Sequence, residues 1–284
     1  MAKACATIHG AVSIVNAIAT RKGATLGIDL QVKITAESGP GHGIIIESGD
    51  KNTSSRLVTA TVQKIVPQRV LKSNRIRLTL ESDIPTGYGL KSSSAISSAV
   101  ALACAKIFKP SMSDRQILLA GVHASIKSKV SITGAYDDAC SCYYGGFNVT
   151  DNARKKRIRS EPGPENLEAV IFIPRNRKRG NLKKLKNLSA VFGHAWELAL
   201  KSRYWEAMIM NGLATSATLN SDPRLVAKLL ENGAYGASMS GNGPAVAAVI
   251  KRINRTKIKK IFDELEGRVI ISKINNKKAE VHEV

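Results

Sequence analysis

The chain has few acidic and few aromatic residues for its size. Its 284 residues include 22 Asp and Glu against 43 Lys and Arg, a net charge of +21, and aromatic residues make up 5%. A basic chain can bind nucleic acid, but binding of single strands normally stacks bases on aromatic side chains, which are scarce here. The basic runs also fall in separate segments, at 154–157, 175–179 and 251–260. We therefore expect nucleic acid not to be the main partner, and we keep a basic RNA-binding protein as the alternative of a different class.

Long apolar runs and paired cysteines are missing as well. No run of about 18 apolar residues occurs, so no membrane-spanning helix is expected. His9, Ser13 and Asn16 interrupt the apolar N-terminal stretch, which argues against a signal peptide. The cysteines lack the spacing of a disulfide framework or a zinc site, so we expect free thiols and a cytoplasmic location. They are Cys5, Cys104, Cys140 and Cys142.

The most informative stretch is rich in glycine and serine and lies between a predicted strand and a predicted helix. Residues 75–80 alternate polar and apolar side chains, and apolar residues recur at helical spacing over residues 92–108. A glycine-rich turn between such elements brings unpaired N–H groups and the positive end of the helix dipole together. This favours an anion, usually a phosphate. The stretch reads Pro85-Thr86-Gly87-Tyr88-Gly89-Leu90-Lys91-Ser92-Ser93-Ser94-Ala95.

This stretch matches neither of the two most familiar phosphate-binding motifs. A P-loop has glycine directly before its lysine, where this chain has Leu90. The dinucleotide-binding motif has its third glycine where this chain has Ser92. Lys91 still adds a positive charge, and the serine hydroxyls can contact phosphate or a metal ion.

Adjacent carboxylates mark a second segment, Ser131-Ile132-Thr133-Gly134-Ala135-Tyr136-Asp137-Asp138-Ala139-Cys140. Two acids among small apolar residues are uncommon, because an unpaired buried charge is unfavourable. In one interpretation they cap a helix that begins at Ala139. In the other they are a catalytic base and a metal-binding or positioning partner.

A third segment, residues 236–243, is again rich in glycine and precedes a predicted strand over residues 245–250. A Rossmann turn enters a helix, so this loop is not one. Its flexible backbone can nevertheless approach a phosphate closely.

The rest of the chain divides at residues 151–166, which are charged and contain proline and glycine. We expect one lobe over residues 1–160 and a second over 161–284. Asp114 is expected to cap a helix. Further strands are predicted at 24–34, 56–62, 167–173 and 268–274, and helices at 114–128, 223–232, 256–265 and, as a pair, 182–220.

Taken in order, the three segments resemble those of the GHMP kinases, the superfamily of galactokinase, homoserine kinase, mevalonate kinase and phosphomevalonate kinase. Within it the chain is most similar to the archaeal shikimate kinases, over nearly its whole length; the resembling segments are Asn16-Ala17-Ile18-Ala19-Thr20 with Gly27-Ile28-Asp29-Leu30, residues 89–95, and residues 131–140. The resemblance implies ATP-dependent phosphorylation of the 3-hydroxyl of shikimate, in the route to chorismate and aromatic amino acids. Homoserine kinase is the second candidate within the superfamily.

The resemblance also implies a fold and roles for individual residues. The fold is α+β: an N-terminal lobe like ribosomal protein S5 domain 2, then a ferredoxin-like lobe. Residues 85–95 would wrap the ATP phosphates, and Gly241 and Gly243 would line the phosphate side of the cleft. Ser93 would bind Mg²⁺. Asp137 would be the catalytic base, with Asp138 as the alternative.

Three features depart from the superfamily pattern. Lys91 stands where most members have glycine, and we expect it to contact the β- or γ-phosphate. The residues 124–136 contain no carboxylate to match the usual magnesium-binding glutamate, so Asp138 or water would replace it. The segment near Lys3 lacks the Pro-Gly-Lys pattern of mevalonate kinases. His9 and Asp29 are further polar candidates for contact with the acceptor, or for a turn or cap.

Overall fold

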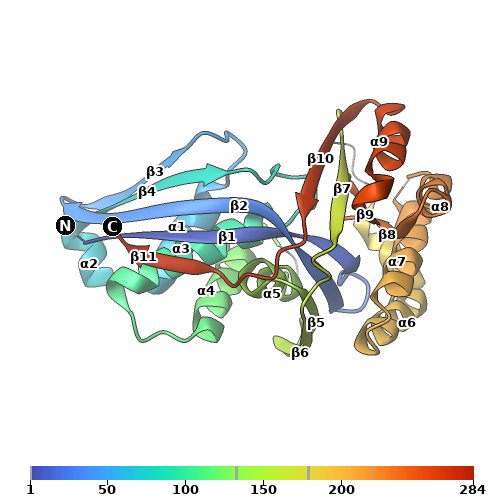
Figure 1. Ribbon diagram of the computed structural model, residues 1–284. Helices are drawn as coiled ribbons and strands as arrows, with labels where there is room; N and C mark the ends of the chain where they lie inside the picture. The colour runs from blue at the N-terminus through green and yellow to red at the C-terminus, as the bar shows by residue number, and fades with distance from the viewer. Residues whose placement is uncertain (1, 132–133, 178–179, 220) are drawn as a thin grey trace.

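The computed structural model describes residues 2–131, 134–177, 180–219 and 221–284. Two sheets organise the chain, each with helices packed against it (Figure 1). This arrangement confirms the α+β class expected from the sequence. No helix in these residues is both long and apolar enough to cross a membrane.

The first sheet has the strand order β11-β1-β2-β4-β3, and β5 joins β2 to the edge strand β6. Only the β3–β4 pair is parallel among the described strands. The strands are β1 (Ala2–Val15), β2 (Lys22–Pro40), β3 (Gly43–Ser48), β4 (Asn74–Ser82), β5 (Phe147–Asp151), β6 (Lys156–Glu161) and β11 (Glu280–Glu283). The helices packed with this sheet are α1 (Ser55–Ile65), α2 (Gln68–Ser73), α3 (Ser92–Phe108), α4 (Asp114–Lys127) and α5 (Tyr136–Tyr144).

The second sheet is antiparallel, with the strand order β10-β7-β9-β8. Figure 1 shows helices packed beside this sheet, and two of them also contact strands of the first sheet. The elements are β7 (Leu167–Pro174), η1 (Leu182–Leu188), α6 (Ser189–Leu200), α7 (Tyr204–Thr218), α8 (Pro223–Glu231), β8 (Ala234–Met239), β9 (Val246–Lys251), η2 (Arg252–Asn254), α9 (Arg255–Asp263) and β10 (Gly267–Lys273).

The end of the chain returns to the first sheet. Strand β11 pairs with β1, and the two termini lie close together in Figure 1. The division into lobes over residues 1–160 and 161–284 remains a prediction.

Helix α3 is the central helix among those packed with the first sheet, and its bounds agree with the predicted range 92–108. It is buried along nearly its whole length, because its residues are mostly alanine and serine. Small side chains allow β1, β2, α1, α4 and α5 to pack around it. This packing fixes the direction of the helix and therefore the place of its N-terminus, to which the glycine-rich stretch leads.

Three local predictions were wrong. Residues 56–62 form part of helix α1 and not a strand, although their valines and threonines favour strands. The helix forms because Leu57, Val58 and Ile65 lie on one buried face and the Ser54 side chain caps the N-terminus. Helix α4 is capped by Ser113, through a capping box with Gln116, and not by Asp114. Residues 236–239 belong to strand β8, so the third glycine-rich loop is shorter than predicted.

One buried asparagine connects the end of β1 in the first sheet with α7 and with β8 of the second sheet. Asn211 of α7 is 0% exposed; its Oδ1 accepts a hydrogen bond from the backbone N–H of Asn16 at 2.8 Å, and its Nδ2 donates to Ser238 Oγ at 2.6 Å. It therefore holds the turn after β1 against α7 and β8.

We expect Asn211→Ala to lower the free energy of unfolding by about 1–3 kcal/mol, because the buried N–H of Asn16 loses its acceptor. The control is Asn187→Ala, at an exposed position of η1, which should have little effect. Urea unfolding of both variants measures the difference. Equal stability of the two variants would contradict the connecting role of Asn211.

Candidate functional site

A cavity of about 300 Å³ lies where the end of β1, the starts of α3 and α5, and the loop after β8 meet. Residues from all three segments singled out in the sequence line it. The candidate site residues among them are Gly87, Gly89, Lys91, Ser92, Ser93, Ser94, Asp137, Asp138 and Gly241. Six other candidates, namely Pro85, Thr86, Tyr88, Leu90, Ala95 and Gly243, are not part of the lining.

Two of those six serve the core instead. The side chains of Leu90 and Ala95 are fully buried in the main hydrophobic cluster. They anchor the stretch on either side of Lys91, so that its backbone faces the cavity. Ile132 and Thr133 of the second segment lie outside the described residues.

The two glycine-rich loops contact each other directly. Ser240 Oγ donates a hydrogen bond to the carbonyl oxygen of Gly89 at 2.8 Å. The N–H of Ala245 donates to the carbonyl oxygen of Tyr88 at 3.1 Å. Gly89 has a φ of +88°, and a Cβ at this position would overlap the carbonyl oxygen of Ser240. Glycine is therefore required here by both conformation and space.

Lys91 is the cation at the centre of this contact. It precedes α3 in the left-handed conformation, with φ 69°, and its side chain is 3% exposed. Its Nζ lies 2.9 Å from Asp138 Oδ1 and donates a hydrogen bond to Ser13 Oγ at 2.7 Å. Ser13 Oγ also accepts a hydrogen bond from the N–H of Gly241 at 2.9 Å. A buried ammonium group needs such partners, and here the two come from different parts of the chain, while Ser13 extends the network to Gly241.

Asp137 is more deeply buried than Asp138, at 4% exposure, and lies in the first turn of α5. Asn152 Nδ2 donates a hydrogen bond to its Oδ1 at 2.6 Å. Burial raises the pKa of Asp137 to about 7 and the charge of Asp138 adds to the increase, while Lys91 and Asn152 oppose it. A carboxyl group with such a pKa can accept and release a proton near neutral pH.

Several polar residues of the site were not predicted. Ser13 and Asn16 both line the cavity, and Asn16 Nδ2 donates to the carbonyl oxygen of Gly241 at 2.7 Å. The available signal was that both interrupt an apolar N-terminal stretch. Asn152, which contacts Asp137, stands in a charged segment that gave no such signal.

His9 and Asp29 are not part of the cavity lining. They lie near each other, with 3.5 Å between His9 Nε2 and Asp29 Oδ1.

Metal-binding side chains do not cluster in the described residues, which contain no group of three or more His, Cys, Asp or Glu that could hold an ion. The four cysteines are buried free thiols, and burial raises the pKa of Cys104 and Cys140 to about 12. Ser93, the expected magnesium ligand, lies in the first turn of α3 and is partly exposed to the cavity.

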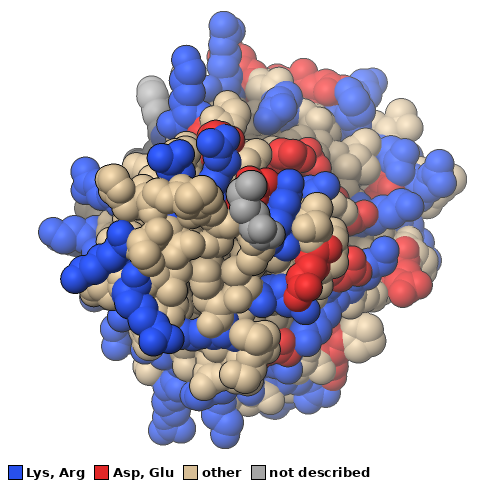
Figure 2. Space-filling model, turned by 90° about the vertical axis from the view of Figure 1, so that its left-hand side faces the viewer, with Lys and Arg blue, Asp and Glu red and all other residues tan. Residues whose placement is uncertain are grey.

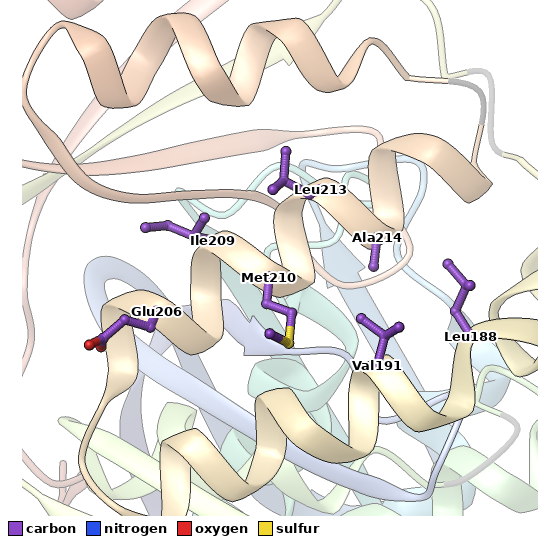
Figure 3. Close-up of a pocket in the computed structure, with 7 residues that line it drawn as sticks. All are labelled: Leu188, Val191, Glu206, Ile209, Met210, Leu213 and Ala214. Carbon is purple, nitrogen blue, oxygen red and sulfur yellow. The ribbon is translucent and has the colours of Figure 1, made fainter.

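A second hollow, of about 460 Å³, lies between α6 and α7 (Figure 3). Its lining is apolar apart from Glu206, and Figure 3 shows this residue at one end of the group. It has no set of converging polar groups for chemistry, so the cavity with the paired acids is the candidate active site.

The basic residues are spread over the face of the molecule shown in Figure 2. Figure 2 shows Lys and Arg across the end of the molecule that carries the termini, with Asp and Glu among them. An area without charged residues separates some of these basic side chains. On this face the positive charge does not form a single continuous stripe.

Two family models match the chain: the GHMP kinases N terminal domain over residues 56–146 and the GHMP kinases C terminal domain over residues 221–269. Among solved structures, a homoserine kinase from Cytophaga hutchinsonii aligns with a TM-score of 0.76 and 18% identity, over 98% of this chain and 97% of that one. The mevalonate kinase of Methanococcus jannaschii aligns with a TM-score of 0.74 and 15% identity, over 96% and 98%. These likenesses confirm the GHMP kinase fold expected from the sequence.

Curated relatives are closer in sequence. A shikimate kinase from Methanosarcina acetivorans is 35% identical, covering 97% of this chain and 95% of its own length. Shikimate kinases from Methanothermobacter thermautotrophicus and Pyrococcus furiosus are 32% and 33% identical, over 96% and 92% of this chain and 96% of each relative. The chain belongs to the GHMP kinase superfamily and, within it, to the same family as the archaeal shikimate kinases.

Proposed function

We propose that the chain transfers the γ-phosphoryl group of ATP to the 3-hydroxyl of shikimate, which yields shikimate 3-phosphate and ADP. ATP use follows from membership of a kinase family. The choice of acceptor rests on relatives named shikimate kinase that align over nearly the whole chain. The observation that carries the chemistry is that the glycine-rich stretch and the paired acids line one cavity.

The triphosphate would lie against residues 87–94. The first N–H groups of α3 have no partners within the helix, and the helix dipole adds partial positive charge at the same place. Lys91 adds a full charge. Fixed donors of this kind are well suited to phosphoryl transfer, which depends mainly on positioning and charge neutralisation.

Ser93 fits the place of a magnesium ligand. It offers one hydroxyl oxygen at the cavity, and Mg²⁺ in nucleotide sites commonly takes most of its ligands from phosphate oxygens and water. When bound, the ion neutralises charge on the phosphates. No further magnesium ligand is assigned to this chain.

Asp137 would accept, or orient, the proton of the attacking hydroxyl. Its burial limits contact with water, and its raised pKa suits a base that works near neutral pH. Asp138 is the alternative base, but its Oδ1 is engaged by Lys91. We therefore assign Asp138 to holding the Lys91 ammonium group in the cavity, and Asp137 to the proton.

Homoserine kinase remains the second candidate for the activity. The solved homoserine and mevalonate kinases are at most 18% identical to this chain, a level that carries the fold and not the acceptor. An ADP-release assay with shikimate, homoserine and mevalonate as acceptors separates the candidates. We expect ATP turnover with shikimate and background rates with the other two. Turnover with homoserine alone would overturn the proposal, and salt-sensitive RNA binding without turnover on any acceptor would favour the RNA-binding alternative.

Asp137→Asn removes the proposed base while keeping the shape of the side chain. We expect kcat to fall by about 10²–10⁴, the usual contribution of a general base, with ATP binding nearly unchanged. Asp263→Asn, on the exposed end of α9, is the control and should keep full activity. Steady-state kinetics and calorimetric titration with ATP test both. Full activity of Asp137→Asn would move the base to Asp138.

Lys91→Ala removes the cation nearest to the expected phosphates. We expect the KM for ATP to rise by about tenfold or more, because a charge-assisted hydrogen bond to a phosphate is lost. Lys109→Ala removes an exposed lysine at the other end of α3 and serves as the matched control. If the ATP KM and kcat of Lys91→Ala equal those of the parent, Lys91 does not contact the nucleotide.

A further inference from the structure

Asn152 forms a closed pair of hydrogen bonds with Asp137. Its Nδ2 donates to Asp137 Oδ1 at 2.6 Å, and its Oδ1 accepts the backbone N–H of Asp137 at 3.0 Å. Asn152 is 3% exposed, and its own N–H donates to the carbonyl oxygen of Arg21 at 2.8 Å. A hydrogen bond to the β1–β2 turn therefore fixes the asparagine, which in turn bonds to both the main chain and the side chain of the proposed base.

The orientation of the Asn152 amide is determined by its neighbours. The N–H of Asp137 can only donate, so the atom facing it must be the amide oxygen. Thr150 Oγ1 donates to the same oxygen at 2.8 Å. The NH₂ group must then face Asp137 Oδ1. A proton on Asp137 Oδ1 would point at the NH₂ group, and two donors would then face each other. A proton that Asp137 takes up therefore belongs on Oδ2.

The other side of the carboxyl group is confined by backbone. A Cβ on Gly23 of β2 would overlap Asp137 Oδ2, so only glycine leaves room for this oxygen. Thr25 Oγ1 donates to the Asp137 carbonyl oxygen at 2.9 Å, which holds the start of α5 against β2. Asp137 is thus fixed from β2 and from the end of β5 at once.

We propose that Asn152 is a positioning residue for the phosphoryl transfer, which reserves Oδ1 of Asp137 as a hydrogen-bond acceptor and leaves Oδ2 as the atom that takes the proton of the acceptor hydroxyl. This inference rests on the proposed function of Asp137 as the base. In the transfer, the hydroxyl O–H bond breaks, its proton goes to Oδ2, and the alcohol oxygen forms the new bond to the γ-phosphorus as the bond to ADP breaks. Asn152 is not part of the cavity lining and would act only through Asp137.

The charged groups around Asp137 set the pH range of this step. Asp138 raises the Asp137 pKa, and Lys91 and the Asn152 amide lower it. The thiols of Cys140 and Cys142 share helix α5, and burial raises the pKa of both, so they stay neutral. The base works when deprotonated, so kcat should fall as the pH drops below the pKa of Asp137. Loss of the Asn152 donor raises that pKa and should move the fall to higher pH.

The test is the pH profile of kcat for shikimate phosphorylation by three chains: the parent, Asn152→Ala and Asn152→Asp. Asn152→Ala removes the donor, and Asn152→Asp also places a carboxyl group beside Asp137 in addition to that of Asp138. We expect the acidic limb to shift to higher pH in the order parent, Asn152→Ala, Asn152→Asp, by about one unit or more for the last, which is tenfold in the protonation equilibrium. Activity lost at pH 7 should largely return at pH 9, with the ATP KM unchanged.

Asn148→Asp is the matched control, because Asn148 is a fully buried asparagine of the same strand region that bonds to the Gly145 carbonyl oxygen instead. It should lower stability without shifting the pH profile. If Asn152→Asp does not fold, Asn152→Ala carries the test with the smaller shift. A loss of kcat by the same factor at every pH would overturn the positioning role while the kinase function stands. Absence of shikimate phosphorylation by the parent chain would instead refute the proposed function.

Discussion

The arrangement of the site depends on the buried ammonium group of Lys91. Its partners are Asp138 at the start of α5 and Ser13 at the end of β1, and Ser13 in turn holds the N–H of Gly241. One cation therefore joins segments that lie far apart in the sequence. Because a buried charge without partners is strongly unfavourable, this arrangement also fixes where the segments can lie. A bound triphosphate would bring new negative charge to the same ammonium group. Lys91 would then both hold the segments of the site together and contact the nucleotide.

Asp137, the proposed base, shows how the same fold shapes the environment of a carboxyl group. Position in the first turn of α5 favours its anion, whereas burial and the charge of Asp138 favour its neutral form. The balance of these effects raises its pKa to about 7. The hydrogen bond that Asn152 Nδ2 donates to Oδ1, with the one that Asn152 Oδ1 accepts from the Asp137 N–H, keeps the carboxyl group in one orientation, which a loop residue exposed to water would not maintain. Small residues, such as Gly23 and those of α3, make the close packing around it possible.

The sequence predicted much of this and missed the parts that depend on tertiary contacts. The bounds of α3 and the positions of the three segments followed from local patterns: periodic apolar residues, glycine turns and adjacent acids. Residues 56–62 were assigned to a strand because β-branched side chains have strand propensity, whereas burial of one helical face decided the outcome. Ser13 and Asn152 could not be assigned roles, since their partners are far away in the chain and become neighbours only in the fold.

The central claim is that the triphosphate and the acceptor alcohol meet between the stretch 85–95 and the paired acids. A crystal structure with a non-hydrolysable ATP analogue, Mg²⁺ and shikimate tests this most directly. The account predicts the terminal phosphate within hydrogen-bond distance of Lys91 Nζ and the shikimate 3-hydroxyl within hydrogen-bond distance of Asp137. A nucleotide bound elsewhere on the chain, or an acceptor hydroxyl facing away from both acids, would contradict it.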